Sequence, residues 1–427
     1  MDIAAIHGLF LKCSSISIDT RKIEQNSMFV ALKGERFDAN TFTNEALQKG
    51  AAFVIIDNPD YFVDQRTILI SNSLQTLQDL AQYHRTFLGI PILALTGSNG
   101  KTTTKELITN VLATKFKVKS TVGNLNNHIG VPLTLLSFSQ ETEIGIVEMG
   151  ANHQQEIAFL CQLAKPDYGY ITNFGKAHLE GFGGIEGVIK GKSEMYDYLR
   201  SHEKTVFINL DDAIQVKQSQ TIASYTFAIC NQDANVSIDM VTANPLVCIT
   251  YKGLLINSHL IGLYNANNIN AAVAIGTFFG IAGADVKRAV ENYIPENNRS
   301  QLITSNSNTI ILDAYNANPS SMKVAIENFL QLDNPNKVLV LGDMFELGVD
   351  SKKEHQGIVS MLRHATAVTC YFVGEKFFES RIEQRNFHFH VNFDDFSNNF
   401  SHIELQNTTL LIKGSRGMAL ERTVAFL

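Results

Sequence analysis

The stretch from Pro91 to Ala113 most constrains what this chain can fold into. An apolar run, PILAL at residues 91–95, leads into TGSNGKTTTKE at residues 96–106, and the residues that follow have helical character. A buried strand, a glycine-rich turn, a lysine with a hydroxyl and then a helix form a nucleotide-phosphate site, because backbone N–H groups and the helix N-terminus face the anion. The lysine would be Lys101, and the hydroxyl that holds Mg²⁺ would be that of Thr102.

The spacing of this turn differs from that of the commonest phosphate loop. That pattern has a longer spacer between its glycines, whereas only Ser98 and Asn99 separate Gly97 from Gly100 here. A glycine–lysine–threonine turn also occurs as a plain strand-to-helix connection. The strand before it, the helix after it and the run of threonines favour the phosphate site.

Length and composition bound the class of protein. The 427 residues, of which 45% are hydrophobic and 18% charged, predict a globular protein of about two to four domains. The net charge of −7 provides no basic surface, so nucleic acid is not expected as a partner. The scattered cysteines argue against a disulfide framework or a zinc site and favour the reducing cytoplasm. No signal-peptide pattern or apolar stretch of the ~20 residues that span a bilayer is found, so membrane insertion is not expected.

Three blocks follow one another along the chain. Residues 1–88 alternate short apolar strands with helical stretches and predict a small α/β domain. Residues 89–295 open with the phosphate loop and contain a β-rich stretch from 205 to 261, followed by a helical segment. Residues 296–427 alternate strands and helices again. This alternation predicts α/β domains whose parallel sheets are covered on both faces.

Two polar residues follow strands of the central block. The strand at 144–147 ends in Glu148, and the strand at 168–171 runs into a glycine-rich loop that carries His178. Ligands gather beyond the carboxyl ends of strands in open parallel sheets. Glu148 is therefore a candidate Mg²⁺ ligand, and His178 is a candidate for binding metal or phosphate. The ordinary alternatives are a capping or turn acid for Glu148 and a structural or surface histidine for His178.

Lys192 falls inside an apolar stripe. The apolar positions of residues 185–199 form one helical face that includes Lys192, whereas Lys190 lies well off it. A buried lysine is costly unless it has a partner or a chemical role. One option is that its ammonium reaches solvent along the side chain. The other is that its neutral amine takes up CO₂ as a carbamate, which turns a cation into an anionic metal ligand. The sequence leaves both options open.

Ordered motifs along essentially the whole chain resemble one family. The chain resembles the Mur ligases of peptidoglycan synthesis in the segments TGSNGKTTTKE, GNLNNHIGVPLTLL (123–136), VEMGANH (147–153), ITNFGKAHLEGFGG (171–184) and the KSEMY lysine. It resembles the dipeptide-adding branch of that family in the segments LDAYNANPSSM (312–322), LGDMFELG (341–348) and LIKGSRGM (411–418). The segments SIDTRKI and MFVALKGERFDANTF resemble its uridine-nucleotide-binding domain.

The resemblance implies a three-domain α/β architecture. A small N-terminal domain would bind the UDP-sugar peptide, a central P-loop ATPase-like domain would bind ATP, and a C-terminal Rossmann-like domain would bind nucleotide and the incoming dipeptide. The implied activity joins D-alanyl-D-alanine to UDP-N-acetylmuramoyl-tripeptide through an acyl phosphate, with ATP and two Mg²⁺ ions. The resemblance also implies a cytoplasmic monomer.

The resemblance further assigns roles to individual residues. The catalytic residues would be Lys101, Lys192 (carbamylated), His178 and Glu148, and the metal ligands would be Thr102, Glu148, His178 and Lys192. ATP would contact Gly97, Ser98, Asn99, Gly100, Lys101, Thr102, Thr103, Asn265, Asn268, Arg299, Asp313 and Asn316. The uridine nucleotide would contact Thr20 and Arg21, the muramyl-peptide arm Asn124, Asn126 and Asn127, and the dipeptide Lys413, Ser415 and Arg416.

Two positions depart from the family pattern. Tyr264 replaces a histidine in the asparagine motif, which we expect to matter little to the chemistry. The segment Asp38-Ala39-Asn40 replaces Asp-Gly-His, which leaves the uridine contacts of the first domain open.

Two other activities compete with the dipeptide ligase. One is a sister ligase of the same fold: the enzyme that adds the third amino acid, a folylpolyglutamate synthetase or a cyanophycin-type ligase. AYNANPSSM favours the dipeptide-adding enzyme. The other is a non-catalytic nucleotide-binding module or P-loop switch. The joint presence of the lysines, acid, histidine and threonine named as catalytic or metal-binding argues against it.

Overall fold

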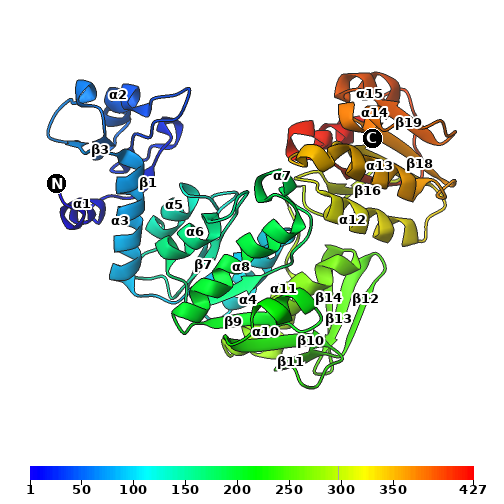
Figure 1. The fold of residues 1–427 in the computed structure, drawn as a ribbon, viewed down its shortest axis with the longest axis horizontal. Helices are drawn as coiled ribbons and strands as arrows, with labels where there is room; N and C mark the ends of the chain where they lie inside the picture. The colour runs from blue at the N-terminus through cyan, green and yellow to red at the C-terminus, as the bar shows by residue number, and fades with distance from the viewer. Residues whose placement is uncertain (297) are drawn as a thin grey trace.

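The structure, a computed structural model, describes residues 1–296 and 298–427. Three lobes follow one another in chain order, and the phosphate loop belongs to the middle one (Figure 1). Each lobe contains a largely parallel sheet with helices against it, as the sequence predicted. The domain boundaries proposed at 88/89 and 295/296 remain predictions.

The N-terminal lobe contains a four-stranded parallel sheet in the order β1-β2-β3-β4. The central strands β2 and β3 are continuous apolar runs in which all residues except Phe53 are buried, as is typical of a parallel sheet covered on both faces. The last helix, α3, contacts α1 and also α5 and α6 of the middle lobe, so it joins the two lobes. The elements are α1 (Ile3–Phe10), β1 (Ile16–Ser17), β2 (Met28–Val30), α2 (Thr43–Gln48), β3 (Phe53–Ile56), β4 (Thr67–Leu69) and α3 (Ser73–Leu88).

The middle lobe is built on a seven-stranded parallel sheet in the order β11-β10-β9-β8-β5-β7-β6. Strand β5 lies between β7 and β8, while the chain leaves β5 for the edge strand β6. This reversal of strand order places a crevice beyond the carboxyl end of β5, where the phosphate loop begins. The strands are β5 (Ile92–Thr96), β6 (Val118–Ser120), β7 (Ile144–Glu148), β8 (Tyr168–Ile171), β9 (Thr205–Asn209), β10 (Ala223–Ile229) and β11 (Val236–Ile238).

Helices cover both faces of this sheet (Figure 1). Helices α10 and α11, the last two of this lobe, pack against α4, the helix that follows the phosphate loop. The helices are α4 (Lys101–Leu112), α5 (Gly130–Leu136), α6 (Glu156–Ala164), α7 (Leu179–Phe182), α8 (Ile185–Ser201), α9 (Ala213–Gln218), α10 (Ala266–Phe278) and α11 (Gly283–Glu291).

Part of the β-rich stretch lies outside the parallel sheets. Strands β12 (Met240–Ala243), β13 (Leu246–Tyr251) and β14 (Leu254–Ile261) form a separate antiparallel sheet. The connections at 244–245 and 252–253 are too short for the crossover that parallel neighbours require. The sequence had marked this segment only as β-rich, and the structure shows that these three strands are antiparallel.

The C-terminal lobe contains a six-stranded sheet in the order β15-β16-β20-β17-β18-β19, parallel except for the edge strand β15. The lobe docks against the middle lobe near α7 (Figure 1). Its elements are β15 (Gln301–Ser305), β16 (Asn308–Asp313), α12 (Pro319–Gln331), β17 (Lys337–Gly342), α13 (Ser351–Leu362), β18 (Val368–Val373), α14 (Glu375–Glu379), β19 (Phe387–His390), α15 (Phe393–Phe400) and β20 (Thr409–Lys413).

Across residues 1–296 and 298–427, no helix combines the length and the apolar character that crossing a membrane requires.

Candidate active site between the middle and C-terminal lobes

A cavity of about 1320 Å³ is lined by residues of the middle and C-terminal lobes. Of the residues predicted to act in the site, Gly97 and the buried Lys192 do not line it, and Thr20 and Arg21 lie in the N-terminal lobe. The predicted residues that line the cavity are Ser98, Asn99, Gly100, Lys101, Thr102, Thr103, Asn124, Asn126, Asn127, Glu148, His178, Asn265, Asn268, Arg299, Asp313, Asn316, Lys413, Ser415 and Arg416.

The phosphate loop requires its two glycines. Gly97 has φ 141° and Gly100 has φ 79°, which are backbone conformations that favour glycine. A Cβ atom on Gly97 would collide with the Thr172 hydroxyl, and one on Gly100 would collide with the side chain of Asn268. The loop is therefore packed tightly from behind, and its open side faces the cavity.

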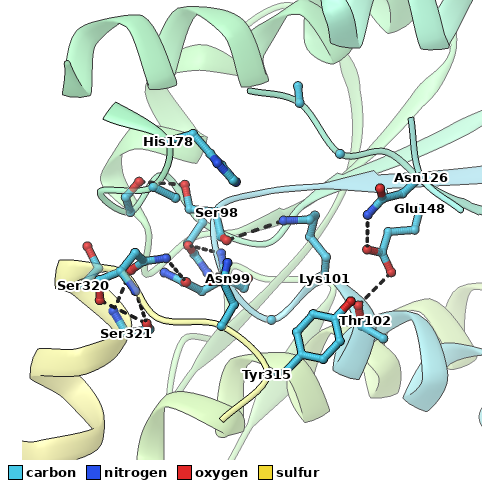
Figure 2. Close-up of a pocket in the computed structure, with 18 of the residues that line it drawn as sticks. Ser98, Asn99, Lys101, Thr102, Asn126, Glu148, His178, Tyr315, Ser320 and Ser321 are labelled. Atoms are coloured by element: carbon cyan, nitrogen blue, oxygen red, sulfur yellow. Dashed lines mark hydrogen bonds between the residues drawn. The ribbon is translucent and has the colours of Figure 1, made fainter. Parts of the chain in front are cut away.

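Lys101 folds back over this loop. Its ammonium donates a 2.7 Å hydrogen bond to the carbonyl oxygen of Gly97 (Figure 2). Burial lowers the pKa of Lys101, and the Glu148 carboxylate opposes that shift. A nucleotide phosphate in the cavity would offer the ammonium a stronger acceptor than a neutral carbonyl.

Glu148 and Thr102 form the pair that fits a magnesium ion. The Thr102 hydroxyl donates a 3.0 Å hydrogen bond to Glu148, and the Asn126 amide donates one of 2.9 Å to the other carboxylate oxygen (Figure 2). The Lys105 ammonium lies 3.7 Å from the same carboxylate, which is only 2% exposed. Adjacent carboxylate and hydroxyl oxygens at the edge of a phosphate site match the hard oxygen ligands that Mg²⁺ prefers.

Lys192 is 1% exposed, and Lys190 is exposed, so the position predicted for Lys192 in a buried stripe is confirmed. Its ammonium donates a 3.2 Å hydrogen bond to the Ala151 carbonyl oxygen and lies 5.0 Å from the centre of the Phe182 ring. Burial holds the pKa of Lys192 well below its usual value, and the charge of Lys101 lowers it further. The neutral amine favoured by this environment is the form that adds CO₂, so the residue fits a carbamate.

His178 immediately precedes α7 and contacts Glu346 of the C-terminal lobe. The imidazole Nδ1 and the Glu346 carboxylate are hydrogen-bonded. That hydrogen bond lowers the pKa of the Glu346 carboxyl. Glu346 was not among the predicted residues, although the LGDMFELG motif contains it.

The asparagine pair, Asn265 and Asn268, supports the helix that follows the phosphate loop. Asn268 donates a 2.8 Å hydrogen bond to Asn265 and accepts one of 3.0 Å from the Thr104 hydroxyl. The substituted residue Tyr264 contacts the Ser300 hydroxyl at 2.9 Å. These contacts tie the start of α10 to both the loop and the beginning of the C-terminal lobe.

The predicted residues of the C-terminal lobe lie just before β15 and at or after the carboxyl ends of β16 and β20. The guanidinium of Arg299 lies 3.5 Å from the centre of the Tyr315 ring. The Lys413 ammonium donates hydrogen bonds to Asp313 and to the carbonyl oxygen of Asn316.

Ser415 and Arg416 differ in how freely they face the cavity. The buried Ser415 hydroxyl accepts a 2.9 Å hydrogen bond from the N–H of Phe345, which ties two loops together. Arg416 has a side chain that is 59% exposed and pairs with Glu421 at 2.9 Å. Of the three residues predicted to bind the dipeptide, Arg416 has the most accessible charge.

Several contacts between the lobes were missed from the sequence. The Asn318 amide donates a 2.7 Å hydrogen bond to the Asn99 side chain. The Lys176 ammonium pairs with Glu354 at 2.7 Å. Asn318 lies in the quoted AYNANPSSM motif, whereas nothing in the sequence around Glu354 marks it.

In the N-terminal lobe, the unusual residue Asn40 is fully buried. Its amide donates to Asp38 at 2.7 Å and to Asp57 at 2.9 Å. At this position the residue therefore holds two loops together.

Comparison with known proteins identifies the family. Three family models match in chain order: "Mur ligase family, catalytic domain" over residues 12–85, "Mur ligase middle domain" over 95–276, and "Mur ligase, glutamate ligase domain" over 298–416. The UDP-N-acetylmuramoyl-tripeptide–D-alanyl-D-alanine ligase of Bacillus subtilis (strain 168) is 35% identical over 98% of this chain and 92% of its own. The chain belongs to the Mur ligase family.

Solved structures share the architecture of this Mur ligase. MurF from Acinetobacter baumannii has a TM-score of 0.85 and 27% identity, with 99% of this chain and 97% of that chain covered. The MurF ligase from Thermotoga maritima in complex with ADP has a TM-score of 0.83 and 26% identity, with 98% and 97% covered. The predicted family and three-domain fold class are therefore confirmed.

Proposed function

We propose that this Mur ligase uses ATP to join D-alanyl-D-alanine to UDP-N-acetylmuramoyl-tripeptide, giving the UDP-MurNAc-pentapeptide of peptidoglycan synthesis. One observation carries the proposal: the phosphate loop faces, across a single cavity, the loops that contain AYNANPSSM and LIKGSRGM. The near-full-length similarity to ligases with this named activity supports it. The complex of the Thermotoga maritima relative with ADP supports the use of ATP.

The first step brings two anions together. The free carboxylate of the tripeptide attacks the γ-phosphorus of ATP, which forms an acyl phosphate and releases ADP. Lys101 and the N-terminus of α4 stabilise the negative charge on the transferring group. Mg²⁺ would supply Lewis-acid stabilisation of the phosphate oxygens, and Thr102, Glu148, His178 and a carbamate on Lys192 would hold two such ions.

In the second step, the neutral amine of D-alanyl-D-alanine attacks the acyl carbon. A C–N bond forms, the bond from carbon to the phosphate oxygen breaks, and the proton lost by the amine leaves with the released hydrogen phosphate. Water competes with the amine for the acyl phosphate, so the docked C-terminal lobe serves to exclude it. Arg416 offers its guanidinium to the dipeptide carboxylate, whereas Lys413 and Ser415 shape the loops around it.

The remaining binding residues keep the roles proposed from the sequence. The nucleotide lies against Asn265, Asn268, Arg299, Asp313 and Asn316, the muramyl-peptide arm lies against Asn124, Asn126 and Asn127, and the uridine nucleotide binds near Thr20 and Arg21. The protein acts as a cytoplasmic monomer on small-molecule substrates.

The experiment that tests this function is phosphate release from ATP and Mg²⁺ with UDP-MurNAc-tripeptide, with and without D-alanyl-D-alanine. We expect release only with the dipeptide, together with the mass of the pentapeptide product. Release with single amino acids instead would assign a sister ligase activity. Hydrolysis of ATP alone would assign a nucleotide switch.

A further inference from the structure

An imidazole and a carboxylate from two lobes meet at the cavity. The Nδ1 atom of His178, in the middle lobe, is hydrogen-bonded to the carboxylate of Glu346, which follows β17 in the C-terminal lobe. Both residues line the cavity, and their side chains are 22% and 55% exposed. The His178 ring lies above the phosphate loop that carries Ser98 and Lys101 (Figure 2).

The direction of this hydrogen bond fixes which atom carries the shared proton. An ionised carboxylate can only accept, so the proton of the bond belongs to Nδ1 of His178. A neutral imidazole with its proton on Nδ1 keeps its lone pair on Nε2. Histidines that bind metals through one nitrogen usually donate from the other to a carboxylate or carbonyl, which orients the ring and raises its basicity. Glu346 is the carboxylate that accepts from His178 in this way.

The backbone on both sides of the contact is unusual. His178 has φ 52° and Glu346 has φ 59°, left-handed conformations that non-glycine residues seldom adopt. Such conformations persist where the surrounding structure imposes them, and they cluster at functional sites. The N–H of Glu180 also donates to the Glu346 carbonyl oxygen at 3.4 Å, so the middle lobe holds this segment by backbone as well as by side chain.

We propose that Glu346 is a positioning residue for the divalent cation held by His178, so that this cation site is complete only while the C-terminal lobe is docked. The proposal rests on the metal role given to His178 under the proposed function. It links two events: the C-terminal lobe brings the dipeptide-binding loops, and the same docking prepares the imidazole for the cation.

The chain offers a matched control for docking itself. Glu354 lies on α13 of the same lobe and pairs with Lys176 of the middle lobe at 2.7 Å. Its side chain makes no hydrogen bond or ion pair with His178 among the described residues. Replacing Glu354 removes an ion pair between the lobes without changing the partner of the imidazole.

The test uses the full-length protein and two measurements. Nitrogen NMR of ¹⁵N-histidine-labelled, metal-free protein reports the His178 tautomer. Mn²⁺ titrated with ADP present, followed by electron paramagnetic resonance, reports cation binding, and His178→Ala identifies the cation that depends on this histidine. We expect Glu346→Ala to remove the preference for a proton on Nδ1 and to weaken that cation by about 10–100-fold. Glu346→Gln, which retains an acceptor, should keep the tautomer and weaken the cation less, and Glu354→Gln should change neither.

Three outcomes would overturn the proposal. The first is an unchanged tautomer and Mn²⁺ affinity in Glu346→Ala. The second is an equal loss in Glu354→Gln, which would reduce Glu346 to a docking contact. The third is Mn²⁺ binding that does not depend on His178. The ligase reaction of the unaltered protein is measured separately, so failure of the proposed function is distinguishable from each of these.

Discussion

The ammonium of Lys413 donates a 2.6 Å hydrogen bond to the carboxylate of Asp313, its direct neighbour across the paired strands β20 and β16. The Lys413 side chain is 2% exposed, and that of Asp313 is 16% exposed. The same ammonium reaches the carbonyl oxygen of Asn316 at 3.3 Å. This ion pair joins the ends of two strands where their loops enter the cavity.

Removal of Asp313 should therefore destabilise this part of the C-terminal lobe. In Asp313→Ala, a buried ammonium loses its partner, and we expect the local opening free energy to fall by about 3 kcal/mol. Hydrogen exchange of the β20 amides measures that free energy. The double variant Asp313→Leu with Lys413→Met leaves no unpaired charge and should recover most of the protection. Unchanged exchange in Asp313→Ala would show that the pair contributes nothing.

Lys101 should be essential to catalysis but not to folding. Its hydrogen bonds go to carbonyl oxygens of its own loop, at 2.7 Å and 3.5 Å, so Lys101→Ala leaves only neutral acceptors without a partner. We expect ATP-dependent ligation to be abolished, because the charge on the transferring phosphoryl group loses its compensation. Phosphate release measures the activity, and circular dichroism checks the fold. Retained turnover would exclude the role given to this lysine.

Lys192 should act through the carbamate formed on its amine and not through the amine itself. Lys192→Ala removes the site of the carbamate, and we expect activity to be lost and then partly restored by acetate or other short carboxylates. Lys190→Ala is the matched control, because Lys190 lies on the same helix and is exposed. It should retain full activity. Absence of rescue would count against the carbamate, while a role in the metal site would remain.

Features that depend on local patterns were predictable. The strand, loop and helix from Ile92 to Leu112 follow from an apolar run, two glycines and a helical segment. The place of Glu148 and His178 at the cavity was predictable because parallel strands direct their carboxyl ends to one edge of the sheet. Lys192 was found because it interrupts the periodicity of an apolar stripe, and its burial bears that out.

Features that depend on how the lobes meet were not predictable. Glu346 is hydrogen-bonded to His178, and Asn318 to Asn99, between the C-terminal and middle lobes. The periodicity of the sequence does not predict which residues meet there. Lys413 was assigned to the dipeptide by the family resemblance, whereas its closest partner is Asp313 of the neighbouring strand in the same lobe. The antiparallel sheet of β12, β13 and β14 was missed because a β-rich stretch alone does not fix strand direction.

A buried histidine pair joins the N-terminal lobe to the middle lobe. The Nε2 atom of His7, on α1, lies 2.9 Å from Nδ1 of His84, on α3. The Nε2 atom of His84 lies 2.9 Å from the carbonyl oxygen of Phe138 in the middle lobe. Because a carbonyl only accepts, His84 carries its proton on Nε2 and accepts the proton of His7 on Nδ1. The His84 ring is therefore neutral in this arrangement, and a second proton on it would set two donors against each other.

This pair should make the junction of the two lobes sensitive to acid. Burial lowers the pKa of both histidines below 6.5, and the charge of His84 lowers that of His7 further. Below pH 6.5 the two histidines bind protons more readily in the unfolded chain than in the folded protein. The free energy of unfolding therefore has its full value above that pH and falls as the pH drops through the lower pKa values of the folded protein. Thermal unfolding between pH 8 and pH 5, followed by hydrogen exchange of α1 and α3, measures the effect. His7→Phe, with one titrating ring fewer, should lose less stability over this range than the unaltered protein; equal losses would place the acid sensitivity elsewhere.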